Sequence, residues 1–190
     1  MNLIRPVILR GDYVLNGASG GLGRQAMAVS EQCVAVVEFH FNSGPASARG
    51  GEVHFQPGVA ESRRFAELMW DGIASTGLPA HGTTPVQPAL ERSAFIVQYS
   101  MPTILLEPLF LSNVEQAGWL HTPDRFEALA ASIVKAILAF VGPAATIGLS
   151  PGHAYKTSAP NDTGAPCLHG DNEKRHVLEM VERVQALLVN

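Results

Sequence analysis

The chain has 190 residues, of which 46% are hydrophobic and 16% are charged. This length and balance predict one folded domain with a sizeable core over residues 1–190, and they exclude a disordered chain. The net charge of −4 at pH 7 argues against nucleic acid as a partner, and two cysteines are too few for a disulfide framework or a cysteine-based zinc motif.

The first part of the chain predicts a short strand at residues 6–10 and a helix over residues 22–31. We expect no export signal, because the first 14 residues lack an apolar run of sufficient length. The glycine run GASGGLG at residues 17–23 resembles the phosphate-binding turn of dinucleotide-binding dehydrogenases. With Glu38 roughly 20 positions later, this run leaves an NAD(P)-dependent oxidoreductase as an alternative. No tyrosine is followed four residues later by lysine, which argues against the short-chain type.

Residues 36–43 read VVEFHFNS and predict a buried strand that ends in polar side chains. Strand alternation places Glu38, His40 and Asn42 on one face. His40 is therefore a candidate metal ligand, and the carboxamide of Asn42 is a candidate group to orient it. Glu38, on the same face, is a further candidate partner of His40. Taken alone, a histidine after an apolar strand is more often a hydrogen-bonded structural residue.

The middle of the chain alternates between strand and helix patterns. Residues 51–56 predict a strand in which His54 points away from Val53 and Phe55 and is half-exposed. Residues 59–76 predict an amphipathic helix that Gly77 ends. Residues 78–91 are expected to be irregular, with His81 as a solvated loop histidine or, alternatively, a hydrogen-bond donor to a transition state.

Three further elements end in residues that can do chemistry. Residues 103–107 form a second apolar strand that ends in Glu107, and a turn follows at residues 108–113. A helix over residues 122–141 begins at Thr122 and Pro123. It is the longest apolar stretch, but it contains Lys135 and is too short to span a bilayer, so no membrane partner is expected. A third strand reaches Pro-Gly-His at His153, and a helix near residues 170–188 carries Glu173 in its first turn.

Two histidines and two glutamates, each at the end of a regular element, make up the set that a catalytic zinc site needs. We assign zinc to His40, His153 and Glu173, with one open position, and the general base to Glu107. Alternatives stay open for single members. Glu173 can be only a first-turn acid that favours the helix dipole, and His169 can compete as a ligand. His121 and His176 are interpreted as surface residues.

These motifs resemble those of the zinc-dependent N-acetylmuramoyl-L-alanine amidases of the autolysin and endolysin type. The family pattern has a strand ending in Pro-Gly-His, a Glu that opens the next helix, a strand ending in His-x-Asn, and a strand ending in Glu before a Phe-Leu-Ser-Asn-like turn. Arg24 and Ala28 also fit, because the family has an Arg sixteen residues before its zinc-binding His and an Ala four residues after that Arg. Ser150 stands where the family usually has Asp before Pro-Gly-His.

The order of the motifs differs from that of the family, in which Pro-Gly-His and its Glu come first. Here they come last, so the resemblance implies a circular permutation that moves the family's first strand and helix to residues 145–190. The implied fold is a three-layer α/β/α domain with a mostly parallel sheet. Circular permutation is physically inexpensive because the termini of compact domains are often close together.

The resemblance implies a zinc-dependent hydrolase that cleaves the amide bond between N-acetylmuramic acid and L-alanine in peptidoglycan. A cell-wall hydrolase without an export signal suggests a phage or prophage lysin. The alternatives are another zinc hydrolase, either a carboxypeptidase or an acylamino-acid hydrolase, and a binding module that has lost catalysis. A carboxypeptidase would need an arginine to clamp a free carboxylate, for which Arg92 and Arg175 are candidates. The presence of Glu107 argues against a binding module.

Overall fold

The computed structural model describes residues 4–13 and 23–190. Its centre is a six-stranded sheet with the strand order β1-β6-β2-β5-β3-β4. The strands are β1 (Arg5–Ile8), β2 (Ala35–Phe39), β3 (Glu52–Phe55), β4 (Val86–Pro88), β5 (Thr103–Glu107) and β6 (Thr146–Pro151). The helices are α1 (Arg24–Ser30), α2 (Ala60–Ala74), the 3₁₀ helix η1 (Glu91–Gln98), α3 (Val114–Leu120), α4 (Pro123–Val141) and α5 (Glu173–Leu188).

Most of the sheet is parallel. β6 pairs in parallel with β1 and β2, and β2 pairs in parallel with β5, whereas β3 runs antiparallel to β5 and parallel to β4. Every residue of β2 is buried, as expected for a central strand that is covered on both faces. The prediction of a mostly parallel sheet is confirmed.

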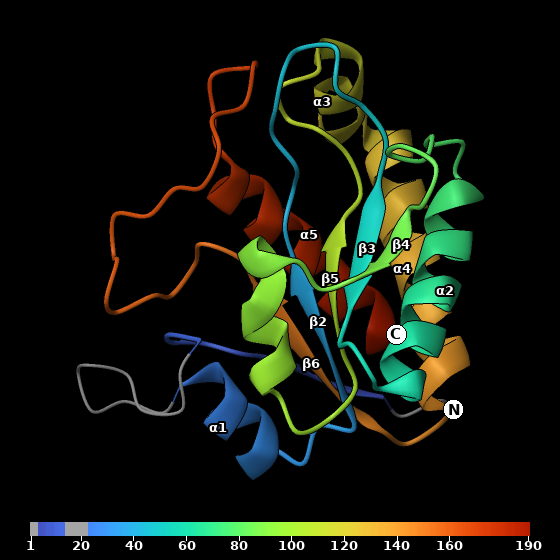
Figure 1. Ribbon diagram of the computed structural model, residues 1–190, viewed down its shortest axis with the longest axis vertical. Coiled ribbons are helices and arrows are strands. Elements are labelled where there is room, and N and C mark those ends of the chain that lie inside the picture. Colours follow the sequence, from blue (N-terminus) through green and yellow to red (C-terminus); the bar gives the residue numbers. More distant parts are fainter. Residues whose placement is uncertain (1–3, 14–22) are drawn as a thin grey trace.

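Helices cover both faces of this sheet, as Figure 1 shows. Helices α2, α4 and α5 pack on one face, and α1 and η1 lie on the other. The larger core lies on the first face, where apolar residues of α4 such as Leu129, Ile133 and Ile137 are fully buried. Full burial of such a side chain contributes about 1.5–3 kcal/mol. The predicted three-layer α/β/α arrangement is thus confirmed.

Parallel pairing brings several strand ends to one edge of the sheet. Phe39 at the end of β2 is in register with Pro151 of β6 and with Leu106 of β5. His40, Glu107 and His153 therefore leave the sheet at the same carboxyl edge, which is where open α/β sheets commonly bind ligands.

Some sequence predictions were wrong in detail. The region predicted to be irregular contains β4, and α3 was not among the predicted elements. His54 is fully buried rather than half-exposed, because η1 covers its face and Ser93 of η1 lies 2.7 Å from its Nδ1. His176 was expected at the surface but is 1% exposed. The glycine run at residues 17–23 lies outside the described residues, apart from Gly23, the N-cap of α1.

None of the helices in the described parts of the chain has the length and apolar character that a membrane crossing requires.

Candidate metal centre

His40, His153 and Glu173 come together at the carboxyl edge of the sheet. The Nδ1 atom of His40 lies 3.0 Å from Oε1 of Glu173, and Nε2 of His153 lies 3.2 Å from Oε2 of the same carboxylate. One ligand atom from each residue lies within 4.8 Å of the other two. The structure thus brings together three sequence-predicted residues that are up to 133 positions apart in the chain.

Glu173 holds the two histidines from the start of α5. The side chain of Asn172 accepts a hydrogen bond from the Arg175 backbone N–H and caps the helix, so Glu173 is its first residue. Backbone N–H groups of Phe41 and Ala165 donate to the two oxygens of Glu173. Burial opposes ionisation of this carboxyl, but hydrogen bonds to His153 and His40 outweigh it and hold the pKa well below its usual range. Glu173 is therefore an anion ready to bind a cation.

The second ring nitrogen of each histidine also has a partner. Nδ1 of His153 lies 2.8 Å from Asp162, and the ammonium of Lys156 pairs with the same carboxylate. The Asp162 carboxylate thus lies where it can hold the His153 ring in position, a contact that the sequence analysis did not predict. The Tyr13 hydroxyl lies 3.4 Å from Nε2 of His40. Burial, reinforced by the charge of Glu38, raises the pKa of Tyr13, so this hydroxyl keeps its proton.

Two glycines leave the space that this cluster fills. A Cβ atom on Gly164 would lie 2.6 Å from Oε2 of Glu173 and 2.7 Å from the His153 ring. On Gly152 it would lie 2.5 Å from the His40 ring. Two imidazoles and one carboxylate are also the donor types that zinc prefers. The residues present therefore fit a divalent metal of this kind.

Glu107 lines the same cleft as the three donor residues. The cleft has a volume of about 300 Å³, and Ser93 and Phe95 of η1 also line it. Ligand atoms of Glu52, His54 and Glu107 lie within 4.8 Å of one another, and Asn42 donates to Glu52 at 2.6 Å. Glu107 therefore lines the cleft beside the three donor residues, at a polar site that it shares with Glu52 and His54.

Glu38 does not orient His40. Its carboxylate accepts hydrogen bonds from Ser150 and Tyr99 and pairs with Arg24 at 3.6 Å, with both charged side chains fully buried. Arg24 also donates to the backbone oxygens of Gly11 and Ala154. This network joins α1 to β2 and to the end of β6.

The other candidate residues lie away from this centre. His169 is not part of the His40 cluster, and His81 lies against the Arg49 carbonyl at 3.1 Å. Arg175 pairs with Glu179 at 2.9 Å and does not line the cleft among the described residues. The side chain of Arg92 lies outside the part of the chain that the structure describes.

The fold and site together define an α/β protein with two histidines and a carboxylate at the carboxyl edge of a mostly parallel sheet. The model of the N-acetylmuramoyl-L-alanine amidase family matches residues 22–139, which is more than half of the chain. The chain belongs to this family, and the resemblance found in its sequence is confirmed.

One curated relative is similar over part of its length. The uncharacterized protein YqiI of Bacillus subtilis (strain 168) is 32% identical over 117 residues, which cover 60% of this chain and 54% of YqiI. The chain spans about half the length of this curated relative.

Solved structures of amidases share the fold. The N-acetylmuramyl-L-alanine amidase Ami1 from Mycobacterium smegmatis is 27% identical with a TM-score of 0.57, over 67% of this chain and 65% of Ami1. The catalytic domain of CwlV from Bacillus (Paenibacillus) polymyxa is 27% identical with a TM-score of 0.54, over 62% of this chain and 63% of CwlV. AmiC2 of Nostoc punctiforme, at 19% identity and a TM-score of 0.56 over 74% of this chain and 98% of AmiC2, supports the fold alone.

Proposed function

We propose that this chain is a zinc-dependent peptidoglycan hydrolase that cleaves the amide bond between N-acetylmuramic acid and L-alanine. The observation that carries the proposal is the convergence of His40, His153 and Glu173 in the cleft that Glu107 lines. Family membership supports the substrate class, because the family and two of its solved relatives are named for this amide bond. The proposed substrate makes the cell wall the place of action.

We also propose that the chain is one circularly permuted catalytic domain. The family match ends at residue 139, so it includes His40 and Glu107 but neither His153 nor Glu173. The C-terminal segment nevertheless supplies β6, which lies between β1 and β2 in the sheet. Two of the three proposed ligands therefore come from a segment that follows the family match instead of preceding it.

In this mechanism the protein binds the metal and moves one proton. His40, His153 and Glu173 would hold zinc, which when bound polarises the amide carbonyl and makes water easier to deprotonate. Glu107 would accept a proton from the attacking water on a carboxylate oxygen. It would then deliver that proton to the amine nitrogen of L-alanine as the amide bond breaks. Asp162 would keep the His153 ring in position throughout.

The test compares metal content with hydrolysis of purified sacculi. We expect zinc to occupy the site of His40, His153 and Glu173 equally in the parent and in Glu107→Gln, because Glu107 is not a ligand. The activity of Glu107→Gln should fall by about 10²- to 10⁴-fold. His153→Ala should lose both metal at this centre and activity. Glu61→Gln, which changes an exposed acid on α2, should behave like the parent.

Product analysis separates the candidate hydrolases. An amidase of the proposed type releases a peptide with a new free amine on L-alanine, whereas a carboxypeptidase releases a C-terminal residue. Undiminished hydrolysis by Glu107→Gln would remove Glu107 from the mechanism. Products without the new L-alanine amine would reject the proposed bond.

A further inference from the structure

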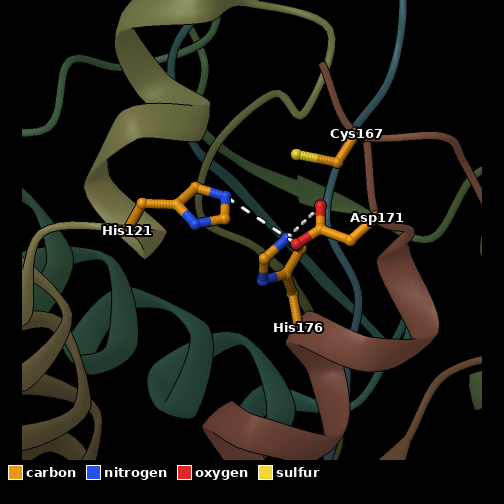
Figure 2. Close-up of side chains that lie close together, drawn as sticks. All are labelled: His121, Cys167, Asp171 and His176. Carbon is orange, nitrogen blue, oxygen red and sulfur yellow. Dashed lines mark hydrogen bonds and ion pairs between the residues drawn. The ribbon is translucent and has the colours of Figure 1, made fainter. Parts of the chain in front are cut away.

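A second cluster of metal-binding residue types lies outside the proposed catalytic centre. Figure 2 shows His121, Cys167, Asp171 and His176, whose side chains point toward one another. They come from three segments, since His121 is the C-cap of α3, Cys167 and Asp171 lie in the loop before α5, and His176 lies in α5. One ligand atom from each residue lies within 4.8 Å of all the others.

The spacing of these atoms is close to that of a four-coordinate site. Nε2 of His176 lies 2.9 Å from Oδ1 of Asp171, and Nε2 of His121 lies 3.8 Å from Oδ2 of the same carboxylate. In a tetrahedral zinc site, bonds of about 2.0–2.3 Å place neighbouring ligand atoms roughly 3.3–3.6 Å apart. Small side-chain rotations would therefore convert the present contacts into a metal-binding arrangement.

The backbone already holds two of the four residues together. The Cys167 N–H donates to the Asp171 carbonyl at 2.8 Å, and the Gly170 N–H donates to the Cys167 carbonyl at 3.1 Å. Pro166 and Asn172 form an antiparallel bridge at the base of this turn. The loop therefore presents the thiol and the carboxylate from one closed turn, and little conformational entropy remains to be lost on binding.

Burial gives a second, independent indication of a ligand. Cys167 is 6% exposed and His176 is 1% exposed. The Nδ1 atom of His176 is buried and makes no hydrogen bond within the described parts of the chain, while Oε2 of Glu179 lies 3.6 Å from it. Histidines that bind metals commonly direct their other ring nitrogen to a carboxylate in this way. His176 thus faces a carboxylate on each side of its ring, Asp171 at Nε2 and Glu179 at Nδ1, which is the arrangement expected of a histidine that binds a cation.

We propose that His121, Cys167, Asp171 and His176 form a second, structural metal site for a thiophilic divalent ion such as zinc. A thiolate with two imidazoles suits zinc and disfavours Mg²⁺ or Ca²⁺, which prefer oxygen ligands. The site shares no residue with the His40 centre. In the sequence, Asp171 and His176 lie on either side of Glu173, which begins α5. A metal at this site would connect the first turn of α5 to His121 at the end of α3.

Cobalt(II) tests the proposal directly, because a thiolate ligand gives cobalt a sulfur-to-metal charge-transfer band in the near ultraviolet. The His40 centre contains no sulfur, so the band reports the second site alone. We expect metal-free full-length protein to bind two equivalents of cobalt and to show this band. Cys167→Ala should lose the band and one equivalent.

Cys33→Ala is the matched control. Cys33 is the other cysteine, it is also 6% exposed, and it packs among apolar residues such as Leu9, Ala28 and Val36. It belongs to none of the candidate ligand groups among the described residues. This variant should keep the band and both equivalents.

Two further variants separate loss of the second site from misfolding and from loss of the His40 centre. His121 has a side chain that is 37% exposed, so His121→Ala should fold and still weaken cobalt binding at the sulfur-containing site by about tenfold or more. His153→Ala should lose only the equivalent without sulfur, so failure of the proposed catalytic centre leaves the band unchanged. A parent protein that binds cobalt without the band, or a band that survives Cys167→Ala, would overturn the second site.

Discussion

At the scale of single residues, the proposed catalytic centre depends on glycines, because the absence of a Cβ atom leaves room for the ligand side chains. Gly164 has a positive φ of 66°, and a Cβ atom there would meet the Glu173 carboxylate and the His153 ring at less than 3 Å. Gly77 has a positive φ of 91°, and a Cβ atom there would meet none of the described residues within 4 Å. An alanine at either position would therefore be strained in its backbone conformation. Only at position 164 would its methyl group also collide with other side chains.

This difference gives a paired prediction. Both Gly164→Ala and Gly77→Ala should lose about 1–2 kcal/mol of stability, because alanine is strained in the left-handed region. Only Gly164→Ala should also weaken zinc binding, since its methyl group displaces Glu173 or His153. Thermal unfolding and zinc titration with a competing chelator measure the two effects. Equal zinc affinity in the two variants would show that the space beside Gly164 is not needed.

Asp162 supports a second prediction at this scale. Asp162→Asn removes the charge that holds His153 and should lower zinc affinity about 10- to 100-fold. Lys156→Gln is the control, because it removes the ion pair with Asp162 and leaves the 2.8 Å contact to His153 in place. Competition with a chelator at fixed pH should rank the parent and Lys156→Gln well above Asp162→Asn. The reverse order would show that the lysine fixes the loop.

The sequence predicted the candidate ligands better than their partners. His40, His153 and Glu173 each end or open a regular element, and this position together with the resemblance to the amidase motifs pointed to them. Asp162 lies in a long loop without periodicity, and only the folded structure shows that its carboxylate faces His153. The prediction that Glu38 is a partner of His40 was wrong. Strand alternation places Glu38 on the face of His40, but it does not show that Glu38 pairs with Arg24.

At the scale of elements, a buried ion pair joins α1 to β2 near the site. Arg24→Met should destabilise the protein by about 3–5 kcal/mol, because it leaves the Glu38 charge buried and unpaired. Adding Glu38→Gln should recover part of this loss, since no charge then remains to be compensated. Urea unfolding of the single and double variants measures the coupling. A double variant that is less stable than Arg24→Met would refute this account.

A second contact between elements predicts a pH dependence. Asp12 follows β1 and accepts hydrogen bonds from Ser158 and Thr157 in the loop after β6. These hydroxyls lower the pKa of Asp12 from 3.8 to about 2. Because the folded-state pKa is depressed, this contribution to stability is complete above about pH 4 and is lost as the pH falls toward 2.

Asp12→Asn tests this linkage. The variant should be less stable than the parent at pH 6, and the two stability curves should converge between about pH 4 and pH 2. Asp71→Asn, on the far helix α2, should run parallel to the parent over the same range. The measurement is the free energy of unfolding in urea at each pH for the parent and both variants. A constant difference between parent and Asp12→Asn down to about pH 2 would contradict the assigned pKa.

The long elements were predictable and the short ones were not. Helices α2 and α4 have a clear apolar stripe and recognisable ends, and their predicted limits lie within two residues of the observed ones. Strand β4 has three residues, too few to show a period, and its strand pairing with β3 comes from tertiary contacts. The burial of His54 likewise depends on η1, which a strand pattern cannot reveal.

At the scale of the whole molecule, the composition of the site depends on where each segment lies in the sheet and less on its order in the chain. β6 and α5 come last in the chain, yet β6 lies between β1 and β2 in the sheet. Ile4 and Val189 line the same groove, so the two ends of the described chain lie close together. His153 and Glu173 both lie after residue 139, where the family match ends, so the proposed site depends on a segment outside that match.

The proposed permutation predicts that the chain tolerates being reordered. A variant that begins at Ala144, runs to Asn190, continues through a short Gly-Ser linker to Met1 and ends at Pro143 should fold and retain its zinc. The new ends fall in the exposed turn between α4 and β6, where few contacts are lost. We expect its stability to lie within about 2 kcal/mol of the parent, the scale of closing one short loop.

Activity and a matched control complete the test of the reordered chain. Activity on sacculi should stay within about tenfold of the parent, because the linker lies at the opposite end of the strands from the site and leaves the positioning of the reacting groups unchanged. A matched variant with new ends between Leu105 and Leu106 interrupts the buried strand β5 and should not fold. Loss of folding in both variants would show that the connection from α4 to β6 is required, and it would reject the view that this segment is a rejoined family terminus.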